Sequence, residues 1–297
     1  SRTPAAAPAP DVLPVAIRGA RVLLVEDNEL NQIVAVELLR DAGFVVDVAD
    51  NGQMALDQLH QTSYDVVLMD MQMPVMDGET ATRQLRQDPR LQDLPVIAMT
   101  ANAMDADWQR CFAAGMNDHV AKPIEPAALW SALSRWIKPR PGLGEAAMLP
   151  AVVAAPGQAP VLASVPRLTG WPPVVQGLNT ALGLQRALGK PALYADMLVR
   201  FVQAQSSVVA QIDAAIAAGN QGLAERLAHT LKSVAANIGA QEASEHAHAL
   251  EQALRHQPAG ASSAQVLPLL GALAAAMEPL VAGLQNWVDQ SGAASAA

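Results

Sequence analysis

Carboxyl, hydroxyl and amino side chains stand at the ends of short apolar runs in the first half of the chain. These residues are Glu26, Asp27, Asp70, Thr100 and Lys122. Carboxylates that meet repel one another unless a cation lies between them, and hard oxygen ligands with room for water suit Mg²⁺ or Mn²⁺. An aspartate beside such a cation and a lysine is a nucleophile for a phosphoryl group, because the cation, the lysine and a hydroxyl offset the charge on the transferred oxygens.

The elements that must bring these residues together alternate between strand and helix. Leucine-rich and β-branched runs predict strands at 21–25, 44–49, 65–69, 95–99 and 118–121. Segments with helical periodicity predict helices at 29–42, 52–61, 77–88, 105–114 and 126–137. This alternation predicts an α/β fold with a doubly wound, five-stranded parallel sheet, in which the carboxyl ends of the strands meet at one crevice.

This first region contains the stretches VLLVEDNELNQ, DVVLMDMQMPVMDG, PVIAMTANA and GMNDHVAKPI. Through them, residues 19–138 resemble a receiver domain of two-component signalling. The resemblance implies a flavodoxin-like fold that is phosphorylated on an aspartate. It also implies the roles of the site residues: Asp70 as the phosphoacceptor, Glu26, Asp27, Asp70 and the backbone carbonyl of Gln72 as ligands of Mg²⁺ or Mn²⁺, and Thr100 and Lys122 as contacts of the phosphoryl oxygens.

The same resemblance implies roles for residues around this site. Pro123 would shape the loop after Lys122, whereas Gln72 and Asn102 match the variable positions that tune hydrolysis of the aspartyl phosphate. One position departs from the family pattern. The switch position three residues before Lys122 is usually Tyr or Phe in receivers, and in this chain it is His119, so the usual aromatic switch residue is missing.

The second half of the chain shows no alternation of strands and helices. Breaks rich in Gly, Pro and Ser separate predicted helices at 178–188, 191–218, 221–239, 243–255 and 266–290. Neither half contains an internal repeat. The pattern predicts an all-α antiparallel helical bundle over residues 178–292.

The third of these helices carries a histidine of interest. On a helical wheel His229 lies about 200° from Leu227, opposite the apolar stripe, which predicts an exposed imidazole. An exposed imidazole can act as a nucleophile for a phosphoryl group, and Lys232 would offset the charge of that group. Ser233 and Ala236 keep the surrounding face flat, which favours the docking of another protein.

The segment around this histidine is AHTLKSVAANIGA. It resembles the H-x-x-K-[GS] signature of histidine phosphotransfer (HPt) domains. The resemblance implies that His229 is both phosphoacceptor and phosphodonor and that Lys232 is its electrostatic partner, with Ser233 in place of the commoner Gly. The other histidines of the bundle, His246, His248 and His256, lack such a motif and are predicted to have no role in transfer.

Together the two regions resemble the carboxy-terminal segment of an unorthodox hybrid sensor histidine kinase. Such kinases pass a phosphoryl group from a kinase histidine to a receiver aspartate, here Asp70, then to His229 and then to a downstream response regulator. No glycine-rich ATP-binding motif occurs, so we expect a phosphotransfer fragment without the kinase core. We expect contact between the two regions, with Asn31, Ala35 and Ile124 against the face around His229.

Three segments are predicted to lie outside the folded regions. Residues 1–18 and 139–177 are rich in Pro and Ala, and proline removes backbone donors, which is typical of linkers. Residues 293–297 are predicted to be a disordered tail. The long linker is expected to let the two regions meet within one chain.

Two other functions were compatible with these residues. The chain could be a regulatory protein-binding module or a phosphate sink that controls its kinase or an effector without onward transfer. It could also be a metal-dependent hydrolase acting through Asp70. The filled set of matching site residues favours a phosphorelay over both alternatives.

The composition limits the partners. The chain has 19 Lys and Arg against 28 Asp and Glu, a net charge of −9, and no basic helix-turn-helix pattern, so no nucleic-acid partner is expected. Prolines interrupt the charge-free stretches 146–166 and 256–277, which argues against direct membrane contact. The single Cys111 fits a reducing compartment. We therefore expect a cytoplasmic location, in a bacterial parent protein anchored in the inner membrane through a missing amino-terminal part.

Overall fold

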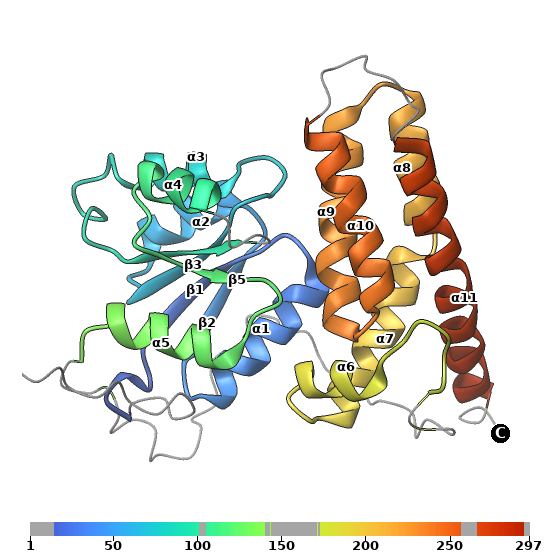
Figure 1. The fold of residues 1–297 in the computed structure, drawn as a ribbon. Helices are drawn as coiled ribbons and strands as arrows, with labels where there is room; N and C mark the ends of the chain where they lie inside the picture. The colour runs from blue at the N-terminus through green and yellow to red at the C-terminus, as the bar shows by residue number, and fades with distance from the viewer. Residues whose placement is uncertain are drawn as a thin grey trace, which may run out of the picture. The chain divides into compact units, whose positions relative to one another are not determined.

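The computed structural model describes residues 15–100, 105–139, 143, 171, 173–256 and 266–293. The chain divides into two compact units, Ser1–Ala154 and Ala155–Ala297. Each unit has its own fold (Figure 1).

The amino-terminal unit is built on a parallel sheet. Its strands are β1 (Arg21–Val25), β2 (Val45–Ala49), β3 (Val66–Asp70), β4 (Val96–Thr100) and β5 (Asp118–Ala121), in the order β2-β1-β3-β4-β5. Every adjacent pair is parallel, which confirms the predicted doubly wound sheet. The chain runs from β1 outward to β2 and then returns to β3 on the other side of β1. Ligands bind where the strand order reverses in this way, at the carboxyl ends of β1 and β3.

Helices cover both faces of this sheet (Figure 1). They are α1 (Glu29–Asp41), α2 (Gly52–Gln61), α3 (Gly78–Leu85), α4 (Asp105–Ala114) and α5 (Pro126–Trp136). The side chains of Asn28, Asn51 and Asp77 accept backbone hydrogen bonds at the first turns of α1, α2 and α3. Each cap satisfies amide groups that have no partner within the helix. The three helices can therefore begin directly after the loops that follow the strands.

The amino-terminal linker prediction needs one correction. Val15–Ile17 form a short 3₁₀ helix, and Ile17 is fully buried in the core of the unit. The predicted linker over 1–18 therefore extends too far toward its carboxyl end. Ile17 belongs to the folded unit, because its apolar side chain is buried away from water.

The carboxy-terminal unit is helical, as predicted. Its helices are α6 (Thr180–Arg186), α7 (Pro191–Gln205), α8 (Val208–Ala217), α9 (Gln221–Ile238), α10 (Gln241–His256) and α11 (Val266–Ala293). The predicted single helix over 191–218 is wrong, because it is split into α7 and α8 at Ser206 and Ser207. Serine side chains compete with the helical backbone for hydrogen bonds, which makes a serine pair a weak point in a helix.

Within the described residues, α11 is the one helix long and apolar enough to cross a membrane, over Val266–Gln290. The sequence alone did not predict this helix as a candidate span, because Glu278 interrupts its charge-free run. Its buried side chains, among them Leu273, Leu280 and Leu284, recur every three or four residues, and the helix packs against α7, α8 and α10. This spacing is typical of a bundle helix that buries one face.

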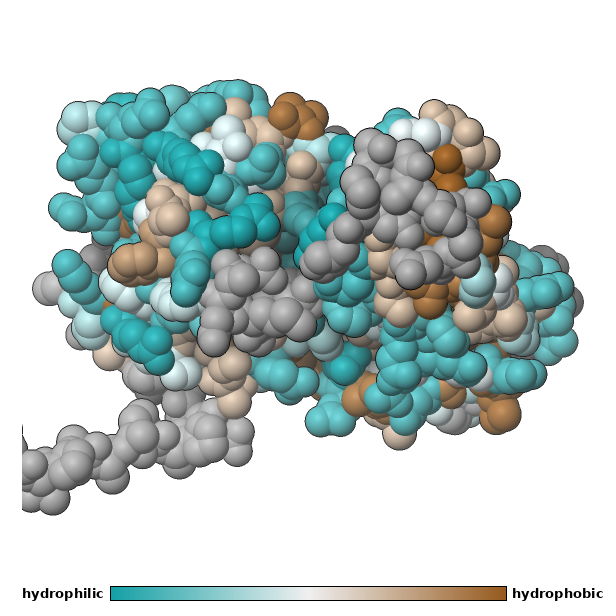
Figure 2. All heavy atoms as spheres, turned by 45° about the horizontal axis from the view of Figure 1, so that its top comes forward, coloured by the Kyte–Doolittle hydropathy of each residue, from teal (hydrophilic) through white to brown (hydrophobic). Residues whose placement is uncertain are grey.

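Hydrophobic side chains on the visible surface are scattered among hydrophilic ones (Figure 2). The most exposed large ones among the described residues include Val75, Phe112 and Leu267, which lie on three separate elements or loops. Single exposed apolar residues of this kind are normal in folded proteins and by themselves indicate no interface.

Candidate functional site

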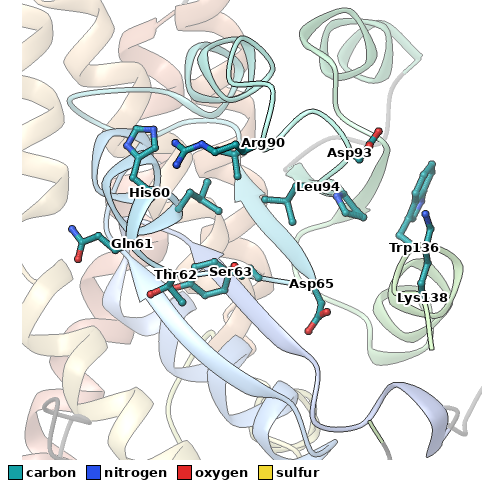
Figure 3. A pocket seen from close by; sticks show the side chains of 14 residues that line it. His60, Gln61, Thr62, Ser63, Asp65, Arg90, Asp93, Leu94, Trp136 and Lys138 are labelled. Atoms are coloured by element: carbon teal, nitrogen blue, oxygen red, sulfur yellow. The ribbon is translucent and has the colours of Figure 1, made fainter. Parts of the chain in front are cut away.

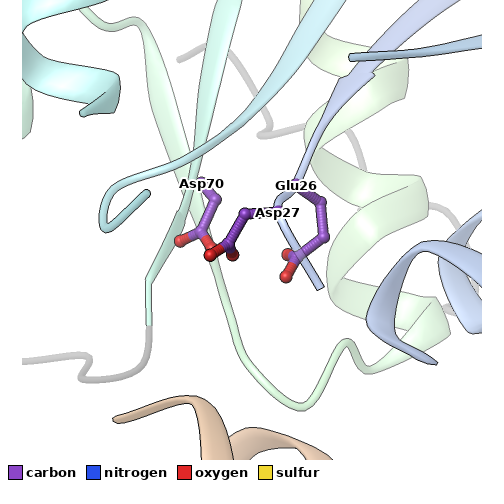
Figure 4. Close-up of side chains that lie close together, drawn as sticks. All are labelled: Glu26, Asp27 and Asp70. Carbon is purple, nitrogen blue, oxygen red and sulfur yellow. The ribbon is translucent and has the colours of Figure 1, made fainter. Parts of the chain in front are cut away.

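Three carboxylates meet at the carboxyl ends of β1 and β3 (Figure 4). The strands pair in parallel, with Val25 opposite Met69, so the residues that follow them emerge side by side. One ligand oxygen from each of Glu26, Asp27 and Asp70 lies within 4.8 Å of the other two. This is the convergence that the sequence predicted, and its all-oxygen donor set with carboxylates at this separation fits a hard divalent cation.

Lys122 lies between two of these carboxylates. Its Nζ is 2.5 Å from Glu26 Oε2 and donates a hydrogen bond to Asp70 Oδ2 at 2.6 Å. Burial would lower the pKa of this ammonium, but the charges of Asp70 and Glu26 outweigh burial and raise it. Lys122 therefore stays charged and offsets part of the negative charge of the cluster.

The carboxylate of Glu26 is buried and hydrogen-bonded. It is 2% exposed, and Asn31 Nδ2 donates a hydrogen bond to its Oε1 at 2.8 Å. Burial outweighs the lowering effect of the Lys122 charge and raises the pKa of Glu26 to about 7. Three carboxylates thus lie together with one ammonium between two of them, which leaves the cluster short of positive charge.

The backbone approaches Asp70 closely from the far side of its loop. A Cβ on Gly78 would lie 2.1 Å from the carbonyl oxygen of Asp70, so only glycine fits there. The amide of Gln72 donates to Asp70 Oδ1 at 3.3 Å. Asp77 caps α3, and Gly78, the first residue of this helix, packs onto the backbone of Asp70.

Two buried polar atoms beside this cluster have no hydrogen-bond partner among the described residues. They are Thr100 Oγ1 and the side-chain oxygen Gln72 Oε1. Thr100 ends β4, next to β3, and its backbone carbonyl accepts a hydrogen bond from the amide of Lys122 at 2.7 Å. An unpaired buried hydroxyl at this edge is available to a bound group that accepts hydrogen bonds.

The remaining predicted residues of this unit lie in varied settings. The peptide bond between Lys122 and Pro123 is cis. The His119 ring contacts the ring of Trp108 in a tilted arrangement with centroids 4.7 Å apart, and its buried Nδ1 has no hydrogen-bond partner in the described part of the chain. Asn102 lies outside the described residues.

The residues proposed for docking lie on α1 and in the loop after Lys122. Asn31 and Ala35 are buried on α1, and the Asn31 amide is engaged by Glu26. Ile124 is half-buried in the loop after Lys122. Asn31 therefore acts first as a support for the carboxylate cluster.

The prediction that His229 is exposed is wrong. The residue is 7% exposed, and Lys232, Ser233 and Ala236 on the same helix are also buried. The helical wheel assumed one packed face, whereas α6, α7, α8 and α10 all pack against α9. Four neighbouring helices leave little of the second half of α9 uncovered.

A carboxylate from the next helix organises the histidine site. Glu251 on α10 is 0% exposed, and its Oε1 lies 2.8 Å from His229 Nδ1. Lys232 Nζ donates to Glu251 Oε2 at 2.5 Å, and Arg255 Nη2 donates to Oε1 at 2.7 Å. His248 Nδ1 is 3.6 Å from Oε2, so this histidine, predicted to lack a role, also borders the site.

Sequence reasoning missed Glu251. The signal was present, because Ala247, Leu250 and Leu254 form the buried face of α10 and Glu251 stands among them. A carboxylate on an apolar helix face requires a cationic partner. Burial alone would raise the pKa of Glu251, but the hydrogen bonds and charges of His229 and Lys232 lower it to about 2. The carboxylate is therefore ionised at neutral pH.

A separate hollow lies at the opposite, amino-terminal edge of the sheet (Figure 3). It has a volume of about 490 Å³, and its lining includes His60, Asp65, Arg90, Trp136 and Lys138. These residues come from the ends of α2, α5 and the loops before β3 and β4. None of the predicted site residues borders it.

Two protein-family models match the chain. Residues 22–134 match the response regulator receiver domain, and residues 196–292 match the Hpt domain. The first match spans the sheet and its carboxylate cluster, and the second spans the helices that carry His229 and Glu251.

Sensor kinases are among the relatives of known sequence. The sensor histidine kinase GacS of Pseudomonas protegens is 32% identical over 250 residues, which cover 83% of this chain and 26% of GacS. The signal transduction histidine-protein kinase BarA of Escherichia coli K12 is 32% identical over 235 residues, covering 79% of this chain and 24% of BarA. The chain thus spans about a quarter of the length of these relatives.

Solved structures match one region at a time. The magnesium-bound receiver domain of the sensor histidine kinase PA1611 from Pseudomonas aeruginosa is 44% identical, with a TM-score of 0.38, and the match covers 40% of this chain and 98% of that domain. A complex of the Saccharomyces cerevisiae phosphotransfer protein Ypd1 with the receiver domain of Ssk1 matches with 27% identity and a TM-score of 0.39, covering 41% of this chain and 90% of the matched chain. The family matches identify this chain as a response regulator receiver domain followed by an Hpt domain, the combination found in hybrid sensor histidine kinases related to GacS and BarA.

Proposed function

We propose that this chain carries two consecutive steps of a phosphorelay. Asp70 accepts a phosphoryl group from the phosphohistidine of a kinase domain, His229 takes it from Asp70, and a downstream response regulator takes it from His229. The observation that carries the proposal is the presence, in one chain, of a carboxylate cluster that contacts Lys122 and of a buried histidine that contacts Glu251, which in turn binds Lys232.

In the first step an Asp70 carboxylate oxygen attacks phosphorus, and the bond from phosphorus to the donor imidazole breaks with its electron pair returning to nitrogen. Lys122 stays beside Asp70 Oδ2 and offsets charge on the phosphoryl oxygens, and Thr100 Oγ1 donates to one of them. Glu26, Asp27, Asp70 and the backbone carbonyl of Gln72 would hold Mg²⁺. When bound, such a cation supplies positive charge to the transferring group, and Mn²⁺ offers similar chemistry.

In the second step the roles of nucleophile and leaving group are exchanged. His229 Nδ1 faces Glu251, so Nδ1–H can donate a hydrogen bond to that carboxylate while Nε2 keeps its lone pair. Nε2 attacks the phosphorus of the aspartyl phosphate, and the Asp70 carboxylate leaves. Lys232 and Arg255 hold Glu251 in place and supply positive charge near the new phosphohistidine.

The proposal includes the partners of the parent protein. The donor is a histidine kinase domain, the final acceptor is a response regulator, and contact between the two units of this chain permits the middle step. Asn31, Ala35 and Ile124 are proposed to contribute to that contact together with Ser233 and Ala236. Because kinase domains use ATP, we place this part on the cytoplasmic side of a parent anchored in the bacterial inner membrane.

The test uses the whole chain with Mg²⁺ and a phosphorylated kinase domain as donor. Base-labile and acid-labile label report the aspartyl phosphate and the phosphohistidine respectively. The expected result is both labels in the parent chain, aspartyl label alone in His229→Gln, and no label in Asp70→Asn. Asp57→Asn and His60→Gln remove an exposed aspartate and an exposed histidine on α2 and should match the parent chain.

Two results would contradict the proposal. Unchanged labelling of His229 in Asp70→Asn would overturn the order of transfer. Incorporation of phosphate from ATP and Mg²⁺ without a kinase domain would show a kinase activity that the proposal does not contain.

A second function is favoured by the burial of His229. A buried phosphohistidine could serve as a phosphate sink, with the chain regulating its kinase and passing nothing onward. Mixing the chain phosphorylated on His229 with a separate receiver domain distinguishes the two. Transfer of label to that receiver supports the relay, and retention on His229 supports the sink.

A further inference from the structure

The hydroxyl of Ser233 is a buried donor that the relay has not used. Ser233 is 4% exposed on α9, and its Oγ has no hydrogen-bond partner within the part of the chain that the structure describes. Helical serines often satisfy this hydroxyl on the carbonyl four residues earlier, which here belongs to His229. Because that bond is not made, the donor remains available for a group that arrives later.

The direction of the histidine ring places its reactive nitrogen on the same side as this hydroxyl. At 100° per residue, Lys232 lies about 60° to one side of His229 around α9 and Ser233 about 40° to the other. Lys232 and His229 Nδ1 both contact Glu251, so α10 lies on the Lys232 side. Nε2 is across the ring from Nδ1 on the edge away from Glu251, and therefore faces the side of Ser233.

The short side chain of Ser233 also leans in the required direction. Every Cα–Cβ bond in an α-helix tilts toward the amino terminus, so a side chain at i+4 leans toward the turn that holds residue i. Ser233 is four residues after His229. Its hydroxyl therefore lies toward the turn from which a phosphoryl group on Nε2 would project.

We propose that Ser233 Oγ–H donates a hydrogen bond to the phosphoryl group on His229 Nε2. This inference rests on the proposed function and adds a positioning residue to it. No covalent bond beyond those of the relay is made or broken, because the hydroxyl keeps its proton. Gly, which is commoner at this position of the motif, has no such donor, so Ser233 favours the phosphohistidine over the aspartyl phosphate in this chain.

The test measures how the phosphoryl group divides between Asp70 and His229. The whole chain is labelled from a kinase domain, the donor is removed, and ³¹P NMR gives the ratio of the two phosphorylated residues. Removing a hydrogen bond to a charged group in Ser233→Ala should lower the ratio of phosphohistidine to aspartyl phosphate about tenfold. Ser233→Gly should do the same, and Ser233→Thr, which keeps a hydroxyl, should restore most of the ratio.

Thr230→Val is the matched control, because it removes a hydroxyl from the same helix about 100° away from His229. It should leave the ratio unchanged. Alanine is the best helix former, so Ser233→Ala is expected to fold, and its thermal midpoint checks this. A ratio within about twofold of the parent chain in a folded Ser233→Ala variant would overturn the inference and leave the relay standing. Absence of label on His229 in the parent chain would instead overturn the proposed function.

Discussion

The two phosphoacceptor candidates of this chain have opposite charge arrangements. At the strand ends, the carboxylates of Glu26, Asp27 and Asp70 lie together, and Glu26 and Asp70 share the ammonium of Lys122. In the bundle, the single carboxylate of Glu251 is shared by His229, Lys232 and Arg255. The first site has more negative charge than its own cation can balance, whereas in the second Lys232 and Arg255 balance the charges of Glu251 and Glu225.

This difference indicates how each site can stabilise a phosphoryl group. A phosphoryl group adds negative charge, so the carboxylate cluster requires an added divalent cation to receive it. The bundle has no such excess of carboxylates, because Lys232 and Arg255 balance Glu251 and Glu225, which allows the phosphohistidine to exist without a metal ion. The comparison therefore predicts different responses of the two sites to metal, to loss of a lysine and to pH.

Metal removal should have the largest effect. Chelation of divalent cations should slow phosphorylation of Asp70 by a kinase phosphohistidine at least about hundredfold, because several kcal/mol of charge stabilisation are lost. Direct phosphorylation of His229 by phosphoramidate, measured in Asp70→Asn, should not change. Parallel stopped assays with and without EDTA measure both rates. An equal loss of rate at the two sites would contradict the claim that only the Asp70 site requires a divalent cation.

Replacing a lysine should have the second-largest effect, and the loss of stability should differ between the two sites. Lys122→Ala leaves buried Glu26 and Asp70 without their shared cation and should destabilise the first unit by about 3–5 kcal/mol. Lys232→Ala leaves Glu251 with Arg255 and His229 and should cost about 1–2 kcal/mol. Calorimetry of the whole chain measures both, since each unit has its own core.

Added Mg²⁺ provides the control for the lysine variants. It should restore part of the stability lost in Lys122→Ala, because the cation can take the place of the ammonium between the carboxylates. It should leave Lys232→Ala unaffected. Equal rescue of both variants would contradict the assignment of the cation site to the strand ends.

The carboxylate cluster could be predicted from the sequence because its geometry follows from local patterns. Each site residue stands at the end of an apolar strand or shortly after it, and the alternation of strands with helices implies a parallel sheet. The carboxyl ends of such strands share one edge, so Asp70 and Glu26 had to lie near each other. Asn31 was assigned to docking instead, since a sequence gives no sign of which side chains hydrogen-bond to Glu26.

The histidine site was harder to predict because it depends on the packing of several helices. A helical wheel describes one helix against one core, and α9 has four neighbours, so the exposure of His229 was misjudged. Glu251 lies 22 residues further along, on a helix whose register against α9 no local pattern contains. The split at Ser206 and Ser207 shows the same limit, because apolar periodicity continues across that break.

The next-largest effect should be a loss of stability of the bundle at acid pH. The pKa of Glu251 is about 2 in the folded chain against a usual value of 4.5. A carboxyl with a lowered folded pKa stabilises the fold above pH 4.5, and that contribution is lost as the pH falls toward 2. The loss should be about 3 kcal/mol. Urea unfolding of the second unit between pH 5 and pH 2 measures it, and Glu251→Gln should remove most of this slope.

The smallest expected effect concerns how Glu251 orients the ring of His229. Glu251→Gln keeps an oxygen that can accept from Nδ1–H, so the ring orientation survives in part while the charge is lost. Transfer from Asp70 to His229 should slow about threefold to tenfold, with phosphorylation of Asp70 unchanged. Glu245→Gln removes a carboxylate from the same helix outside the contacts of His229 and is the matched control. Rapid-quench measurement of the second step tests this, and a rate equal to that of the parent chain would mean that Lys232 and Arg255, rather than Glu251, hold the site in its reactive geometry.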